Sequence, residues 1–284
     1  MQTAESDTAR SLDTFAEAAD YAIVGPTDNR VQVADTTRFP FNTICHLGRD
    51  FGDGRLRGCS GVLIAPRAVL TAAHCLYNLL LRRAPRRILI SPGRRDRDTI
   101  PFGALEASRA YVARGFARPG RPRRASLSAY DYGLIVLPRP FRGLGRFMRI
   151  VAPTDAELVA IQRNGLIGIA GYPGDRPIGT MWRHMEALKG WTPRRLHYTV
   201  QTCPGHSGSP IWHRSALPEP PILVGVHTSG VTDERGRPYG CRRDTVLAPP
   251  GMMNSGVRIL PEIVEDLVDP ERAPRGKERM IRVL

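Results

Sequence analysis

The feature that most constrains the fold is a succession of short apolar segments separated by turn residues. These segments are rich in Val, Ile, Leu and aromatic residues and are bounded by Gly, Pro, Asp or Asn, which is typical of β-strands. Many short strands with little helical periodicity favour an all-β barrel or sandwich. The segments expected to form strands are 42–47, 60–65, 68–72, 87–91, 109–113, 132–137, 166–171, 196–201, 209–213, 222–227 and 256–260.

The two ends of the chain and one internal stretch have a different character. Residues 1–22 are polar and rich in Ala, Asp and Glu, which indicates a weak helix or a disordered leader. Residues 115–129 predict a Pro/Arg/Ser loop or insertion, and 269–284 predict a charged tail. Regular helical periodicity is convincing only over 261–268, where Pro261 suits a first turn.

Composition excludes several classes of protein. The chain has 284 residues, of which 42% are hydrophobic and 24% charged, so it can bury a sizeable core and is not wholly disordered. No apolar run is long enough to span a bilayer, so no membrane span is expected. The net charge is +14, but the arginines are scattered and no nucleic-acid-binding module is present. We therefore expect arginine-rich surface loops, with acidic partners as the alternative, and no nucleic-acid partner.

The five cysteines indicate disulfides rather than a metal site. They are Cys45, Cys59, Cys75, Cys203 and Cys241, with no CxxC pair and no histidine at zinc-ligand spacing. Two disulfides with one cysteine left over is the simplest count, and it indicates an oxidising compartment. The N-terminus has no recognisable signal peptide, which leaves the route of export open.

Three short stretches carry candidate chemistry. His74 ends the apolar run TAAHC, Asp131 precedes the apolar strand in YDYGLIV, and Ser207 stands in CPGHSGSP between two glycines and two prolines. Each has an ordinary structural alternative: a buried core histidine, a turn aspartate and a turn serine.

Taken together, the three residues predict a catalytic set. Serine is a poor nucleophile until an imidazole takes its proton, and a buried carboxylate fixes the tautomer of that imidazole. The backbone N–H groups of Gly205 and Ser207 are expected to converge on the developing oxyanion, because a Cβ at position 205 would hinder the required conformation.

An α/β-hydrolase is the main rival fold, since GHSGS nearly fits the G-x-S-x-G pattern. The position two residues after Ser207 is Ser209 instead of glycine, and the order His, Asp, Ser differs from that fold's order. The chain also lacks alternating strand and helix patterns.

The sequence resembles the chymotrypsin-like serine endopeptidases, and within them the V8-like and Bacillus-type glutamyl endopeptidases. The resemblance covers roughly 23–268 and is weakest over 80–125 and 140–165. Its motifs are IVGPTDNR (23–30), ADTTRFPF (34–41), GCSGVLIAPRAVLTAAHC (58–75), YDYGLIVL (130–137), GYPGDRPIGTMW (171–182), YTVQTCPGHSGSP (198–210), GVHTSG (225–230) and NSGVRI (254–259).

The resemblance implies two antiparallel six-stranded β-barrels with a short C-terminal helix. The first barrel, 23–145, would carry His74 as general base and acid and Asp131 as its orienting group. The second barrel, 146–268, would carry Ser207 as nucleophile and the specificity pocket. It also implies the bridges Cys59–Cys75 and Cys203–Cys241.

The residues around the serine predict which bond is cut. In trypsin-like enzymes an aspartate six residues before the nucleophile binds Arg or Lys, and Gln201 stands there instead. Thr202 and His227 match the residues that bind the substrate carboxylate in glutamyl endopeptidases. Hydrogen bonds from a hydroxyl and an imidazole compensate the burial of a carboxylate. An ordinary strand threonine and an edge histidine are the alternative.

Activation is expected to depart from that of trypsin. Ile23 begins the IVG motif that resembles a processed N-terminus, which makes 1–22 a leader or propeptide. His206 replaces the aspartate that pairs with the new amine in trypsin-like zymogens, so that ion pair cannot form. We hypothesise that removal of 1–22 frees Ile23 for a role near the specificity pocket.

The sequence thus predicts a secreted or extracytoplasmic, monomeric serine endopeptidase that cuts protein or peptide substrates after Glu, with Asp slower. No cofactor and no metal are expected. The alternatives are a serine endopeptidase of different specificity and an inactive binding module on the same fold.

Overall fold

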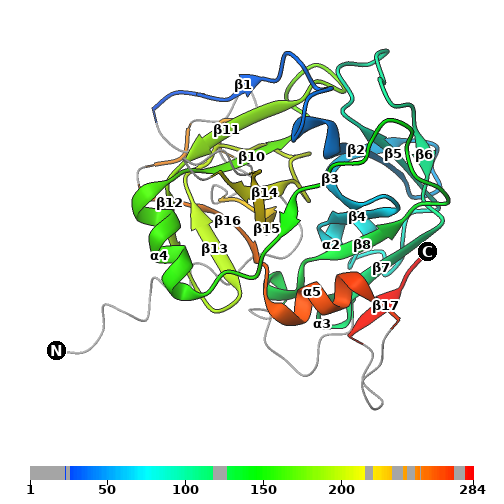
Figure 1. Cartoon of the computed structure of the whole chain (residues 1–284). Coiled ribbons are helices and arrows are strands. Elements are labelled where there is room, and N and C mark those ends of the chain that lie inside the picture. The colour runs from blue at the N-terminus through cyan, green and yellow to red at the C-terminus, as the bar shows by residue number, and fades with distance from the viewer. Residues whose placement is uncertain are drawn as a thin grey trace.

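Each of the eleven predicted strand segments overlaps a strand of the computed structural model, which contains two curled, largely antiparallel β-sheets side by side (Figure 1). The leader expected over 1–22 and most of the Pro/Arg/Ser loop lie outside the described residues. The structure describes residues 23, 26–117, 127–214, 220–231, 239–241, 247–249, 251–271 and 279–284.

The first sheet carries most of the expected N-terminal barrel. Its order is β17-β7-β8-β4-β3-β2-β5-β6. The strands are β2 (Ile44–Asp50), β3 (Leu56–Ala65), β4 (Ala68–Thr71), β5 (Arg87–Pro92), β6 (Leu105–Glu106), β7 (Arg109–Ala113), β8 (Gly133–Val136) and β17 (Met280–Arg282).

The second sheet carries the expected C-terminal barrel. Its order is β1-β11-β10-β14-β15-β16-β13-β12, and β9 pairs in parallel with β15. The strands are β1 (Val31–Gln32), β9 (Arg149–Ile150), β10 (Ile167–Gly171), β11 (Trp182–Glu186), β12 (Leu188–Trp191), β13 (Arg195–Tyr198), β14 (Pro210–His213), β15 (Ile222–Ser229) and β16 (Asn254–Arg258).

The two-sheet, all-β architecture is confirmed, but three details of the sequence expectations need correction. Within the described residues the sheets hold eight and nine strands, where six per barrel were expected, because short edge strands extend them. β1 lies within the range assigned to the first barrel, yet it pairs with β11 of the second sheet. β17 lies within the expected charged tail, yet it pairs with β7 because Met280 is buried in the core.

The helices are few and short. The predicted helix over 261–268 is α5 (Pro261–Val268), with proline in its first turn. The sequence missed α4 (Asp155–Asn164), whose N-terminus is closed by a capping box between Thr154 and Glu157. The remaining turns are η1 (Phe41–Thr43), α2 (Ala73–Leu76), α3 (Arg114–Ala117) and η3 (Ser128–Tyr130). None of the described helices is long and apolar enough to cross a membrane.

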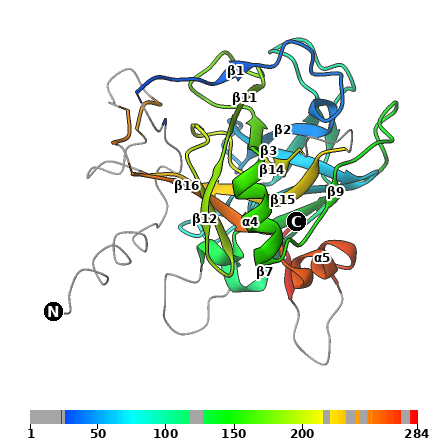
Figure 2. The ribbon, with the colours of Figure 1, turned by 60° about the vertical axis from the view of Figure 1, so that its left-hand side comes forward.

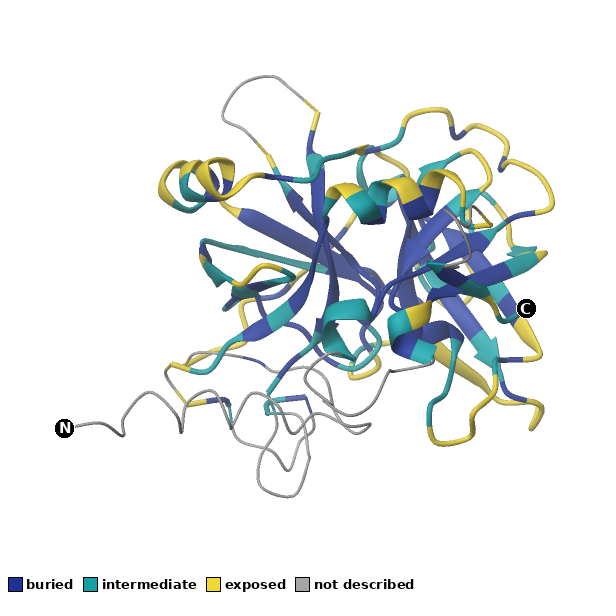
Figure 3. Ribbon diagram, turned by 90° about the horizontal axis from the view of Figure 1, so that it is seen from below, coloured by how far each residue is buried: buried dark blue, intermediate teal, exposed yellow. Residues whose placement is uncertain are grey.

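Buried side chains join the two sheets into one packed unit. One core cluster combines Leu70 and Leu134 of the first sheet with Trp212 and Val226 of the second. Figure 3 shows the strands of both sheets buried through the interior, with exposed residues in the connections. Figure 2 shows α4 in front of β12, with which it is in contact, while α5 lies apart from it. The junction of the sheets is where the candidate site forms.

Candidate active site

Strand register brings His74 and Asp131 together. β4 and β8 are antiparallel neighbours, and Thr71 at the end of β4 pairs with Gly133 at the start of β8. His74 follows Thr71 in the single turn of α2, and Asp131 lies two residues before Gly133. Residues 57 positions apart in sequence therefore meet at one end of the first sheet.

Three side chains form a continuous hydrogen-bonded chain. The His74 Nδ1–H donates to Asp131 Oδ2 over 2.7 Å, and the His74 backbone N–H donates to Oδ1 over 2.9 Å. The carboxylate of Asp131, with its side chain only 8% exposed, is thus satisfied from one residue and holds the ring in the Nδ1–H tautomer. Ser207 Oγ donates to His74 Nε2 over 2.5 Å. The sequence-predicted trio is assembled in the order that acyl transfer requires.

Residues 203–209, here called the serine turn, lead into β14 of the second sheet but are held by the first. The N–H of Ser60, on β3, donates to the carbonyl of Ser207 over 2.8 Å. Gly208 has a φ of +80°, and an added Cβ would lie 2.1 Å from the Thr71 hydroxyl and 2.3 Å from the Ser60 carbonyl. Only glycine allows the turn to approach β3 and β4 this closely. This contact between sheets sets the position of Ser207 against His74.

Gly205 occupies a backbone conformation that requires glycine. Its φ is +104°, and an added Cβ would lie 2.3 Å from the Tyr172 carbonyl oxygen and 3.0 Å from the Gly174 nitrogen. The Gly205 carbonyl accepts from the Ser60 hydroxyl over 2.8 Å, which orients the peptide that follows it. The preceding peptide is held through Pro204, whose carbonyl accepts from the Gly174 N–H over 2.7 Å.

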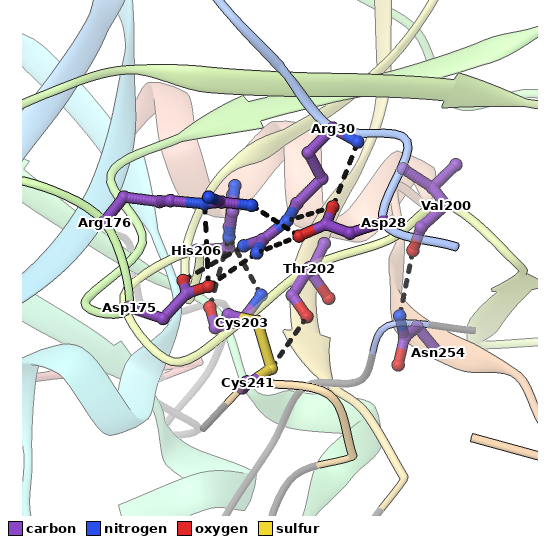
Figure 4. Close-up of a disulfide and its surroundings, with 10 residues drawn as sticks. All are labelled: Asp28, Arg30, Asp175, Arg176, Val200, Thr202, Cys203, His206, Cys241 and Asn254. Atoms are coloured by element: carbon purple, nitrogen blue, oxygen red, sulfur yellow. Dashed lines mark hydrogen bonds and ion pairs between the residues drawn. A yellow bond between two sulfur atoms is a disulfide. The ribbon is translucent and has the colours of Figure 1, made fainter. Parts of the chain in front are cut away.

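Two disulfides flank the site. Cys59 pairs with Cys75 and joins β3 to the turn that carries His74, with 6.3 Å between the Cα atoms. Cys203 pairs with Cys241 beside the serine turn (Figure 4). Cys45, whose pairing the sequence left open, is a free thiol in the core, and burial raises its pKa far above the usual range.

The residues expected to form the specificity pocket are fully buried. Thr202 lies five residues before Ser207, and its Oγ1 has no hydrogen-bond partner among the described residues. His227, on β15, exchanges backbone hydrogen bonds with the serine turn through Gly208 and Ser209. Its Nδ1 lies 2.6 Å from the hydroxyl of Tyr198. Burial, reinforced by His206, His74 and Arg195, lowers the pKa of His227 well below its ordinary value, so the imidazole is neutral.

Gln201 and His206 take roles that differ from those of their trypsin counterparts. The Gln201 side chain accepts from the Asn29 N–H over 2.6 Å and donates to the Thr27 carbonyl over 2.6 Å, so it anchors the N-terminal segment. His206 is fully buried, and its Nδ1 accepts from the Cys203 N–H over 3.0 Å. Burial and the charge of Arg30 lower the pKa of His206 to about 4, so it carries no charge at neutral pH.

Ile23 lies buried against the Cys203–Cys241 bridge. Its N–H donates to the Tyr239 carbonyl over 3.0 Å, and its carbonyl accepts from the Ala248 N–H over 2.9 Å. The residue that the sequence placed near the pocket is therefore in contact with the disulfide that closes one side of the serine turn.

Several residues of the site were missed by sequence reasoning. Ser60 supports both the serine turn and Gly205, Tyr198 binds His227, and Arg30 forms buried ion pairs with Asp175. Each of these residues acts on a partner far away in the sequence, so the local sequence pattern could not predict its role. The one available hint was Arg30 itself, a charged residue followed directly by the first strand.

The described residues contain one group of potential metal-ligand atoms, from Cys59, His74 and Cys75. Its two sulfurs are joined in a disulfide, and a disulfide sulfur is not the thiolate that binds metals. The histidine is already bonded on both ring nitrogens. This group fits a metal ion poorly.

Two packed antiparallel sheets with a serine, histidine and aspartate linked at their junction define a chymotrypsin-fold serine endopeptidase. A family model described as Trypsin matches residues 32–245, more than half of the chain. The chain therefore belongs to the trypsin family.

The chain is similar to bacterial members of this family. A glutamyl endopeptidase of Bacillus licheniformis is 29% identical over 251 residues, which cover 87% of this chain and 68% of that protein. A Bacillus subtilis protein named extracellular metalloprotease is 27% identical over 210 residues, covering 74% of this chain and 63% of that protein. A solved structure of a Glu endopeptidase in complex with MPD has a TM-score of 0.66 and 25% identity, covering 87% of this chain and 97% of that one.

Proposed function

We propose that this chain is a secreted serine endopeptidase that cleaves protein and peptide substrates after glutamate, and after aspartate more slowly. The observation that carries the proposal is the hydrogen-bonded chain from Asp131 through His74 to Ser207, with bonds of 2.7 and 2.5 Å. The two disulfides support an oxidising, extracytoplasmic location.

In the proposed reaction Ser207 Oγ attacks the scissile carbonyl carbon while His74 Nε2 takes its proton. The resulting imidazolium is stabilised by the Asp131 carboxylate, and it returns the proton to the leaving amine. Water then attacks the acyl-enzyme with the same histidine as base. The N–H groups of Gly205 and Ser207 stabilise the oxyanion, and one such donor contributes about 2.7–4 kcal/mol to barrier lowering.

Glutamate specificity is proposed from Thr202 and His227. Both are fully buried beside the serine turn, and Thr202 Oγ1 makes no hydrogen bond to the described residues. A substrate carboxylate would accept hydrogen bonds from this hydroxyl and from the neutral imidazole, each contributing roughly 1.5–3 kcal/mol. Gln201 offers no negative charge for Arg or Lys, and its amide is bonded to the N-terminal segment. The similar glutamyl endopeptidases support the same choice.

Two assays test this function. A fluorophosphonate probe should label the native protein but not Ser207→Ala, and lack of labelling of the native protein would indicate an inactive module. Peptides that differ only at the residue before the cut, with Glu, Asp, Gln, Arg or Phe, should be cleaved fastest after Glu. Preference for Arg or Phe would overturn the proposed Glu specificity but not the assignment of the chain as a serine endopeptidase.

The expected zymogen is tested separately. If removal of 1–22 gives Ile23 a role near the pocket, N-terminal sequencing of the active form should begin at Ile23. Full activity on Glu peptides with residues 1–22 intact would contradict this.

A further inference from the structure

An arginine in the N-terminal segment places a buried charge close to the serine turn, where it acts on His206. The guanidinium of Arg30 is 0% exposed and forms bidentate pairs with two carboxylates (Figure 4). It bonds Asp28 at 3.0 and 2.8 Å and Asp175 at 3.0 and 2.5 Å. Arg176 lies against the same two carboxylates, at 2.5 Å from Asp28 and 3.7 Å from Asp175. Two cations and two anions balance, which makes the burial of this charge tolerable.

The segment that carries Arg30 is attached to the base of the expected pocket. Gln201 binds the backbone of Thr27 and Asn29 through both ends of its amide. β1, which follows Arg30 directly, adds a strand to β11 of the second sheet. The position of the guanidinium is therefore set from both sides, by a side chain next to the pocket and by strand pairing.

Asp175 connects this charge to the peptide that matters for catalysis. The residue before it, Gly174, donates its N–H to the Pro204 carbonyl over 2.7 Å. A peptide unit is planar and its C=O and N–H point in opposite directions, so this bond also aims the Gly205 N–H away from Gly174. Tyr172 and Gly174 also pack directly on the Gly205 Cα. The loop 172–175 thus determines how the proposed oxyanion donor points.

We propose that Arg30 is a positioning residue that holds the oxyanion donor in its active orientation, through the link Arg30–Asp175–Gly174–Pro204. This rests on the proposed function, which assigns the Gly205 N–H to the oxyanion. The buried guanidinium supplies the positive charge beside the serine turn, where His206 excludes the pairing of a new N-terminal amine with an aspartate.

The test compares Arg30→Gln and Asp175→Asn with a matched control in the full chain. Arg258→Gln also removes a buried arginine, one that bonds Asp155 at 2.7 Å and the Pro153 carbonyl at 2.5 Å. Among the described contacts, Arg258 makes none with residues 172–175 or 203–207. Loss of an ion pair to a buried arginine is common to the variants, while the link to Gly205 is lost only in the first two.

We expect kcat on a Glu peptide to fall about 10- to 100-fold in Arg30→Gln and Asp175→Asn, with KM nearly unchanged, because an oxyanion donor acts on the transition state. Fluorophosphonate labelling should slow in parallel. Arg30→Lys should recover part of kcat because it retains the charge. Arg258→Gln should lower the Tm and leave kcat per folded molecule unchanged.

The double variant tests the proposed link, and the native enzyme tests the proposed function separately. Since both residues act through one link, Arg30→Gln/Asp175→Asn should lose no more kcat than the larger single loss. Losses that multiply, or a kcat in Arg30→Gln equal to that of Arg258→Gln, would overturn the inference. A native chain that neither cleaves Glu peptides nor reacts with the probe would overturn the proposed function instead.

Discussion

Replacing Gly205 by alanine tests the proposed oxyanion site most directly. The residue has a φ of +104°, and the added Cβ would meet the Tyr172 oxygen at 2.3 Å and the Gly174 nitrogen at 3.0 Å. Both are backbone atoms, so no side-chain rotation can relieve the contact. The turn has to shift, and the Gly205 N–H shifts with it.

The expected loss has two separable parts. Backbone strain at a positive φ costs on the order of 1–3 kcal/mol of folding stability. Loss of one oxyanion donor typically lowers kcat by about 10²–10³, which corresponds to roughly 2.7–4 kcal/mol in the activation barrier. Thermal unfolding measures the first part, and kcat per labelled active site on a Glu peptide measures the second.

Gly54→Ala is the matched control. Gly54 also has a positive φ, +70°, but an added Cβ has no atom within 4 Å. It should therefore lose stability from strain and keep its kcat. If kcat of Gly205→Ala stays within about threefold of kcat of Gly54→Ala, the Gly205 N–H does not stabilise the transition state, and the assignment is wrong.

Three further outcomes follow from the site. Thr202→Val keeps the side-chain volume and removes the hydroxyl. Therefore kcat/KM on a Glu peptide should fall about tenfold or more, while kcat/KM on a matched Gln peptide should change less. Equal changes on the two peptides would place Thr202 outside the carboxylate site. Burial and Arg30 lower the folded-state pKa of His206 to about 4, below its unfolded value of about 6.5, so the unfolded chain binds the proton first. The contribution of His206 to the free energy of unfolding should therefore be complete above about pH 6.5 and decline as the pH falls toward 4. The decline should be less steep in His206→Gln. Urea unfolding measures it, on a Ser207→Ala background to prevent autolysis. Finally, EDTA should leave kcat unchanged, and a loss restored by zinc would show that the similarity to a protein named metalloprotease reflects a shared metal.

The local sequence pattern was enough to predict elements whose ends and apolar faces are set by neighbouring residues. α5 combines a first-turn proline with a clear apolar face, and its bounds agree with the prediction. α4 was missed because only Leu158 and Ile161 of its ten residues are buried, which leaves a short apolar face. β1 and β17 were missed because strands of two or three residues carry no periodicity, and both exist through pairing with a distant partner.

The proposed reacting groups could be selected from the chain alone, because acyl transfer needs particular chemistry. A serine between glycines, a histidine after an apolar run and an aspartate before a strand occur together in the required order. Gly205 could also be selected, because the proposed oxyanion site needs a residue without a side chain at that position.

The tertiary structure alone decided how those groups are held. Ser60 supports the serine turn from the other sheet, Tyr198 binds His227, and Arg30 bonds a carboxylate 145 residues further along the chain. Such partners are ordinary Ser, Tyr and Arg in sequence, since their role comes from the residues that folding places beside them. The sequence by itself predicted which atoms react, and the packing of the two sheets determined their distances, their burial and their charge.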